Sequence, residues 1–81
     1  MNKQSILLVE DDEDILQLLA FNFESAGFDV HTAEDGTLGL AKARRHKPDL
    51  VVLDLMLPGM NGFDVCKELK RDPETMDIPV I

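Results

Sequence analysis

The sequence predicts an α/β protein built on a parallel sheet with helices on both faces. Residues 5–10 and 49–54 are short, continuous apolar runs, which are typical of strands buried on both sides. The stretches between the apolar runs have helical spacing and end in helix-stop residues. Strand–helix alternation implies right-handed crossovers in one sheet. We therefore expect the order β-α-β-α-β-α-β in an open, doubly wound sheet.

Four strands are expected in this order. They are "SILLVE" (5–10), "FDVHTA" (28–33), "DLVVLD" (49–54) and "IPVI" (78–81). The second alternates between polar and apolar residues, so it is expected nearer an edge of the sheet. Pro79 is compatible with a strand only near its beginning or on an edge.

The first helix is expected to begin at Asp12 or Asp14 and to stop at Gly27, because Asp caps helix N-termini and Gly ends helices. Its predicted apolar face consists of Ile15, Leu18, Leu19 and Phe23.

Two further helices follow. Asp35 or Thr37 opens the second, which runs through "LGLAKARRHK" to its end at Pro48. Its basic end suits the negative pole of the helix dipole. The third covers residues 62–72 and closes before Pro73. Its predicted apolar face consists of Phe63, Cys66 and Leu69.

Composition sets the limits on function. The 81 residues carry 16 acidic and 8 basic side chains, which indicates one small domain and argues against direct binding to nucleic acid phosphates. No apolar run approaches the ~20 residues that span a bilayer, so no membrane association is expected. The single Cys66 cannot form an internal disulfide, which fits a reducing cytosol. We expect a cytoplasmic protein.

Acidic residues follow two of the predicted strands. Glu10, Asp11 and Asp12 end the first strand, and Asp54 ends the third. Ligands of open parallel sheets bind at the carboxyl ends of the strands, so these carboxylates converge if the two strands are neighbours. Two like charges ~4 Å apart repel by ~4 kcal/mol at an effective dielectric near 20, so the cluster is destabilising unless it is protonated or bridged by a cation. A few hard oxygen ligands suit Mg²⁺.

Asp54 is the candidate nucleophile of this site. A carboxylate can accept a phosphoryl group, and such transfer depends mainly on positioning and charge stabilisation. The turn "LMLPG" leaves the strand at once, so the backbone carbonyl of Met56 can face the same pocket. Pro58 and Gly59 are expected to shape the turn, and Gly62 to open the next helix.

Structural roles are expected for the other residues that could carry chemistry. The simpler interpretation of Asp12, Glu13 and Asp14 is a negative first helical turn, whereas for Glu10, Asp11 and Asp54 we favour function. The run "KARRHK" is interpreted as a solvated helix face. His31 and His46 are interpreted as surface or helix-end residues. The expected core or near-core residues are Cys66, Phe21, Phe23, Phe28 and Phe63.

The chain resembles the receiver domain of two-component response regulators. The matching segments are "ILLVEDDEDI", "AEDG", "KPDLVVLDLMLPGMNGFDVCKELK" and "DPETMDIPVI". The resemblance implies a flavodoxin-like fold with strand order 2-1-3-4 in this chain, where complete receivers have 2-1-3-4-5. It also implies that a sensor histidine kinase or phosphotransfer protein is the phosphoryl donor, in an Mg²⁺-dependent transfer.

Carried over by position, the resemblance makes Asp54 the phosphoacceptor. It makes Asp11 and Asp54 metal ligands together with the Met56 carbonyl, with Glu10 acting through water. The chain ends at Ile81, inside the expected fourth strand, so residues 1–81 are expected to be the N-terminal part of a receiver. The last strand, the last two helices, and the family's Ser/Thr and Lys that contact the phosphoryl group are not matched. An apolar face left uncovered in this way predicts self-association.

Three functions compete on this sequence. The leading one is a signalling module that is phosphorylated on Asp54 and switches an output, and that is not a turnover enzyme. An aspartate-nucleophile phosphatase is disfavoured, because Met56 stands where such enzymes carry a general acid. The third is a non-phosphorylated interaction module or a folding fragment.

Overall fold

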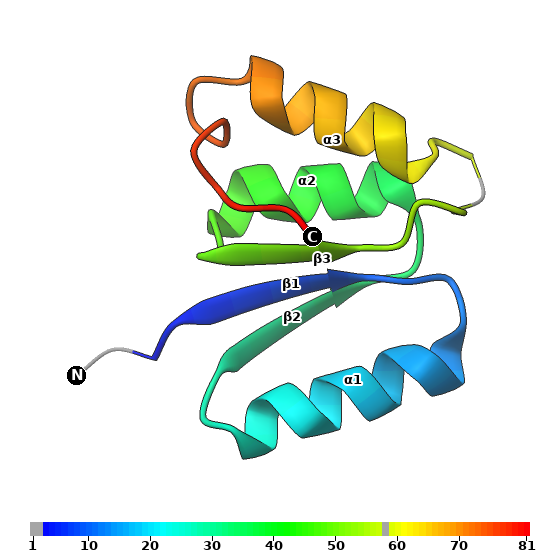
Figure 1. Cartoon of the computed structure of the whole chain (residues 1–81), viewed down its shortest axis with the longest axis vertical. Coiled ribbons are helices and arrows are strands. Elements are labelled where there is room, and N and C mark those ends of the chain that lie inside the picture. The colour runs from blue at the N-terminus through cyan, green and yellow to red at the C-terminus, as the bar shows by residue number, and fades with distance from the viewer. Residues whose placement is uncertain (1–2, 58) are drawn as a thin grey trace.

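Three strands and three helices alternate along the chain in the computed structural model, which describes residues 3–57 and 59–81 (Figure 1). The elements are β1 (Ser5–Val9), α1 (Glu13–Ser25), β2 (Asp29–Ala33), α2 (Gly36–His46), β3 (Leu50–Leu53) and α3 (Gly62–Arg71). Pro58, to which the sequence assigned a turn, lies outside the described residues. Among those residues, no helix has the length and apolar character needed to cross a membrane.

The strands form one parallel sheet in the order β2-β1-β3. As Figure 1 shows, α1 covers one face of this sheet while α2 and α3 cover the other. The predicted doubly wound architecture is therefore confirmed, as are the adjacency of the first and third strands and the edge position of the second.

The predicted fourth strand is reduced to a single bridge. Val80 pairs in parallel with Val51 on the side of β3 away from β1. The Val51 and Leu53 amides donate to the carbonyls of Pro79 and Ile81 at 2.9 and 2.8 Å, and the Ile81 amide donates to Val51. Pro79 has no amide to donate to β3. The position of this segment beside β3 agrees with the order 2-1-3-4.

The core consists of two layers separated by the sheet. The β1 side chains from Ile6 to Val9 are at most 1% exposed and point alternately into each layer. The layer beneath α1 contains Ile6, Leu8 and Leu16, packed by Leu19, Ala20, Phe23, Phe28, Val30, Leu50 and Val52. The layer beneath α2 and α3 contains Leu7, Val9, Ala33, Leu40, Ala43, Val51, Leu53, Leu57, Val65 and Leu69.

The predicted apolar face of α1 is wrong for Ile15 and Leu18. These residues are 47% and 61% exposed, whereas Leu16 is 5% exposed and was not predicted to face the sheet. The helix is rich in apolar residues on more than one stripe, and the stripe through Leu16 and Phe23 meets the sheet. Phe23 packs edge-on against Phe28, as expected of near-core residues. Phe21 is 68% exposed, so its predicted core position is also wrong.

The predicted apolar face of α3 requires a similar correction. Phe63 is 66% exposed, and the buried residues of this helix are Gly62, Val65 and Leu69. Leu69 is confirmed and Cys66 is half-buried against the core. Helix α3 lies above α2 at the margin of the sheet (Figure 1), so only its stripe through Val65 and Leu69 reaches the buried layer.

Helix boundaries follow the predicted capping chemistry. The Asp12 carboxylate accepts the amides of Asp14 and Ile15 at 2.9 and 3.2 Å, and the Asp35 carboxylate accepts the Leu38 amide at 2.7 Å. These contacts satisfy amides that lack partners within the helix. Gly27 has a φ of 97° just after α1, a conformation that glycine adopts with little strain. Caps thus fix where both helices begin relative to the strands.

Candidate functional site

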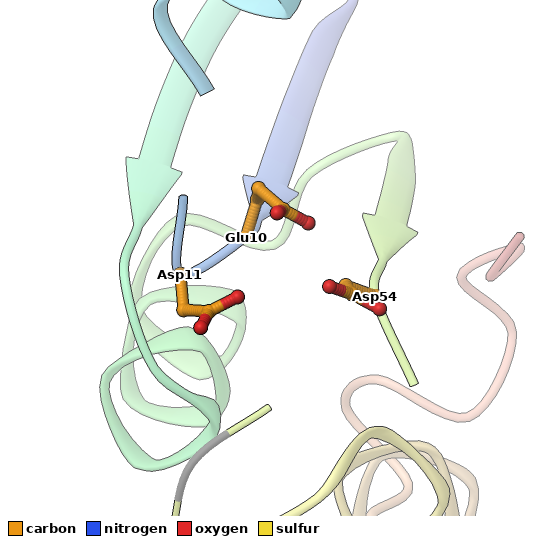
Figure 2. A group of neighbouring side chains, drawn as sticks. All are labelled: Glu10, Asp11 and Asp54. Atoms are coloured by element: carbon orange, nitrogen blue, oxygen red, sulfur yellow. The ribbon is translucent and has the colours of Figure 1, made fainter. Parts of the chain in front are cut away.

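The ends of β1 and β3 bring three carboxylates together. Val9 pairs with Leu53 in the parallel register, and the Asp54 amide donates to the Val9 carbonyl at 3.0 Å. Glu10, Asp11 and Asp54 therefore emerge side by side at the carboxyl edge of the sheet (Figure 2). One ligand oxygen from each lies within 4.8 Å of the other two. The convergence expected from the sequence is present.

Burial is graded across this cluster. Glu10 and Asp54 are half-buried, whereas Asp11 is exposed. Asp54 follows the last residue of β3, so its carboxylate stands at the rim of the sheet rather than in the apolar interior. This position explains how a charged residue can follow an apolar strand without the cost of full burial.

The cluster concentrates negative charge. Desolvation raises the pKa of Glu10 above its usual value, and the neighbouring Asp54 carboxylate raises it further by hydrogen bonding and repulsion. Asp11 adds a smaller repulsion, while the Asp12 amide, which donates to Glu10 Oε1 at 3.3 Å, opposes the rise. In the described part of the chain, no ion pair neutralises these three residues.

This donor set fits a small divalent cation. Three carboxylates supply hard oxygen atoms, and their number leaves room for the waters that Mg²⁺ normally retains. Asp12 is not part of the cluster, because its side chain caps α1. The interpretation of Asp12 as a helix-terminal residue is thereby confirmed.

The exit turn after β3 orients the Asp54 side chain. The Met56 amide donates to Asp54 Oδ1 at 3.0 Å, which restrains the carboxylate at the point where the chain turns. Met56 has an 83% exposed side chain, and the metal-binding role of its carbonyl stays a prediction.

Gly62 allows α3 to approach this turn closely. A Cβ atom at position 62 would lie 2.5 Å from both the Asp54 carbonyl oxygen and Leu55 Cα. The Gly62 amide also donates to the Leu55 carbonyl at 3.1 Å. The first turn of α3 therefore buttresses the backbone that carries Asp54. The sequence identified Gly62 only as the residue that opens the helix.

An apolar rim beside the acids was missed by the sequence interpretation. A cavity of about 500 Å³ next to the cluster is lined by Asp11, Leu55, Met56, Leu57, Asn61 and Phe63. Phe63 had been assigned to the core because aromatic residues usually lie there. The only available signal was its place in the first turn of α3, next to the loop that leaves the site.

The fold and this acidic edge together define a class of signalling domain. The family model described as the response regulator receiver domain matches residues 6–81, and the chain belongs to this family. It is 51% identical over 76 residues to the DNA-binding dual master transcriptional regulator RpaA of Synechocystis sp., and 54% identical over 71 residues to the alkaline phosphatase synthesis transcriptional regulatory protein PhoP of Bacillus subtilis. These matches cover 94% and 88% of the chain but only 32% and 29% of the relatives.

Solved receiver structures match closely in three dimensions. Chemotaxis response regulator CheY4 of Vibrio cholerae superimposes with a TM-score of 0.93 at 30% identity, over 98% of this chain and 66% of CheY4. The receiver domain of sensor histidine kinase PA1611 from Pseudomonas aeruginosa, which has a magnesium ion coordinated in its active-site cleft, gives a TM-score of 0.93 at 26% identity. That match covers 98% of this chain and 65% of the other. The chain thus spans about two thirds of the receivers that it matches.

Proposed function

We propose that this chain is a phosphoacceptor signalling module in which Asp54 receives a phosphoryl group. The observation that carries the proposal is the convergence of Glu10, Asp11 and Asp54 at one sheet edge, within 4.8 Å of one another. Membership of the receiver family supports it. We further propose that the chain corresponds to the N-terminal part of a receiver domain and acts as an acceptor rather than a turnover enzyme.

In this proposal the Asp54 carboxylate is the nucleophile. One of its oxygens forms a bond to phosphorus while the bond between phosphorus and the donor breaks, and the electron pair leaves with the donor. For a phosphohistidine donor the leaving group is the imidazole nitrogen, and the product on this chain is an acyl phosphate. Restraint of Asp54 Oδ1 by the Met56 amide limits the rotamers of the carboxylate, which favours attack from one position.

The acidic residues around Asp54 suit the binding of Mg²⁺. We assign Asp11 and Asp54 as direct ligands, with the Met56 carbonyl as a third and Glu10 acting through water. When bound, Mg²⁺ would neutralise the carboxylates and the incoming phosphoryl oxygens. Without a cation, the negative charge of the three carboxylates would repel an approaching phosphoryl group.

The proposed donor is a sensor histidine kinase or a phosphotransfer protein. This assignment comes from the family and from the 16 acidic side chains, which disfavour nucleic acid as a direct partner of this segment. RpaA is a DNA-binding regulator, but the match with this chain covers only 32% of RpaA. A cytoplasmic location is proposed because the single cysteine fits a reducing compartment.

Phosphorylation of Asp54 can be tested directly. The chain is incubated with Mg²⁺ and a small acyl phosphate, and its intact mass is measured beside those of Asp54→Asn and Asp77→Asn. Asp77 is an exposed carboxylate outside the cluster, so Asp77→Asn is the matched control. We expect one base-labile phosphoryl adduct on the unmodified chain and on Asp77→Asn, and none on Asp54→Asn or after Mg²⁺ is removed with a chelator.

Other outcomes of this experiment would contradict the proposal. An equal adduct on Asp54→Asn would place the phosphoryl group elsewhere. Free phosphate released over many turnovers would indicate a phosphatase. Absence of both an adduct and Mg²⁺ binding would leave an interaction module.

We also propose that the 81-residue chain self-associates through the face beside β3. A groove of about 290 Å³ there is lined by Leu53, Leu55, Phe63, Cys66, Val80 and Ile81. Phe63 and Ile81 are 66% and 74% exposed, and exposed apolar surface of this kind favours association. We expect the mass measured by light scattering to rise with concentration, and to rise less for Phe63→Ser than for Phe21→Ser on α1. A mass that stays monomeric at high micromolar concentration would refute this proposal.

A further inference from the structure

The two histidines of the chain stack against each other. His31 lies in β2 and His46 is the last residue of α2. Their ring centroids are 4.0 Å apart and the ring planes differ by only 10°. His31 is half-buried and His46 is exposed. Because neither has an acidic or cysteine partner at ligand spacing in the sequence, they had been interpreted as surface or helix-end residues.

The position of the stack follows from the alternation of β2. Asp29, His31 and Ala33 share one face of this strand, and Ala33 belongs to the core layer beneath α2 and α3. Helix α2 crosses that face, so its C-terminal residue reaches His31. Lys42, one turn earlier on α2, donates from Nζ to the carbonyl of Thr32. Two side-chain contacts thus attach the C-terminal half of α2 to the outer strand of the sheet.

We propose that the His31–His46 stack is a pH-sensitive clasp, which holds the C-terminal part of α2 on β2 while at most one ring is protonated and opens when both are. Neutral imidazoles stack as flat aromatic rings, and one imidazolium can still lie over a neutral ring. Two imidazolium rings with centroids 4.0 Å apart repel each other.

The surrounding charges favour opening at low pH. From α2, Lys42 and Arg45 add positive charge near His46; from β2, Asp29 opposes them. The Asp29 carboxylate lies 4.0 Å from His31 Nε2, so it can pair with that ring in its charged form. With both rings protonated, His46 would face an imidazolium and two further cations, and among the described residues that act on this ring the Asp29 carboxylate, 63% exposed, is the group that offsets them.

The direction of the His46 titration agrees with this geometry. Desolvation lowers the pKa of His46 below its usual value, and repulsion from His31, Arg45 and Lys42 lowers it further. The folded state therefore binds fewer protons than the unfolded state in the acidic range. The contribution of the clasp is present above the ordinary histidine pKa of about 6.5 and is lost as the pH falls from there through the lowered folded value.

Amide exchange and imidazole titration by NMR test the clasp in the intact chain. Protection factors are corrected for intrinsic exchange and compared between about pH 5 and about pH 8, across the range in which histidine titrates. We expect protection of residues 43–46 to be lost at the acidic end relative to residues 16–20 of α1. In His46→Phe, which keeps an aromatic ring but cannot be protonated, protection should not depend on pH. In His46→Gln, which removes both properties, it should be low at every pH.

Two results would overturn the inference. The first is an equal pH dependence of α2 protection in the unmodified chain and in His46→Phe. The second is that both imidazoles of the unmodified chain titrate with one common, ordinary pKa and that the α2 amide shifts do not follow them. Because the chain contains only two histidines, their signals can be assigned with the single variants.

Discussion

The two outer sides of the sheet are protected in opposite ways. Beside β2, polar groups cover the edge: Lys42 binds the outward carbonyl of Thr32, and the His31–His46 stack lies next to it. Beside β3, backbone partners come from Pro79 and Ile81, but apolar side chains such as Phe63 and Ile81 are left exposed. The β2 side therefore has polar side-chain cover, whereas the β3 side has paired backbone groups and uncovered apolar surface of the kind that favours association.

The candidate site lies between these two sides, at the carboxyl ends of β1 and β3. Because β1 is the central strand and its residues from Ile6 to Val9 are at most 1% exposed, Glu10 and Asp11 follow directly from the most deeply buried strand of the sheet. Asp54 is carried by the strand next to the apolar side. Perturbations of the β3 side are therefore expected to reach the site, whereas those of the β2 side are expected to leave it largely intact.

The largest loss of stability is expected when the core layer beneath α2 and α3, to which β1, β2 and β3 all contribute, is disrupted. Leu7 is 1% exposed in the centre of β1, so Leu7→Ala should lower the free energy of unfolding by about 2–5 kcal/mol. Chemical denaturation followed by circular dichroism measures this change. The matched control is Leu18→Ala at a 61% exposed position, where a change within about 0.5 kcal/mol is expected. Equal losses of stability at the two positions would contradict the assignment of Leu7 to the core and of Leu18 to the surface.

An intermediate loss of stability, with structural change confined to the β3 side, is expected when Gly62 is replaced. In Gly62→Ala, the new Cβ would lie 2.5 Å from the Asp54 carbonyl oxygen, so the turn must shift, at a cost of about 1–3 kcal/mol. NMR should show displaced amide signals for Asp54 and Leu55 while those of β2 stay in place. Lys67→Ala, on the exposed side of the same helix, serves as control. Unchanged Asp54 signals would show that α3 does not buttress the site.

The smallest loss of stability is expected when the contact of Lys42 on the β2 side is removed. Lys42→Met keeps an unbranched side chain but removes the donor to the Thr32 carbonyl, so stability should fall by about 0.5–1.5 kcal/mol. The freed edge should also increase association, as measured by light scattering. Lys67→Met removes an exposed charge without an edge contact and should change neither quantity. An identical result for both variants would mean that Lys42 does not protect the edge.

Much of the fold could be predicted because it depends on local patterns. Continuous apolar runs identified β1 and β3, alternation identified β2, and Asp12, Asp35 and Gly27 marked helix ends through chemistry confined to a few residues. The acidic cluster followed as well, since carboxyl ends of neighbouring parallel strands must share an edge.

The wrong core assignments concern which stripe of a helix meets the sheet. Ile15, Leu18, Phe21 and Phe63 are apolar and have helical spacing with other apolar residues, so periodicity alone allowed more than one buried face. Exposure of Phe63 depends on how far α3 lies toward the margin of the sheet. That offset is set by packing between elements and has no signature within the helix itself.

The order of elements, the helix ends and the placement of carboxylates at strand ends follow from the amino-acid sequence alone, because local backbone and capping preferences govern each of these. The other features depend on how the elements pack against one another. Packing places Gly62 against the turn that carries Asp54, sets Phe63 at the rim of the cavity beside the acidic cluster and stacks His31 on His46. These features involve residues from different elements. They form only when the two core layers pack and so set where each helix crosses the sheet.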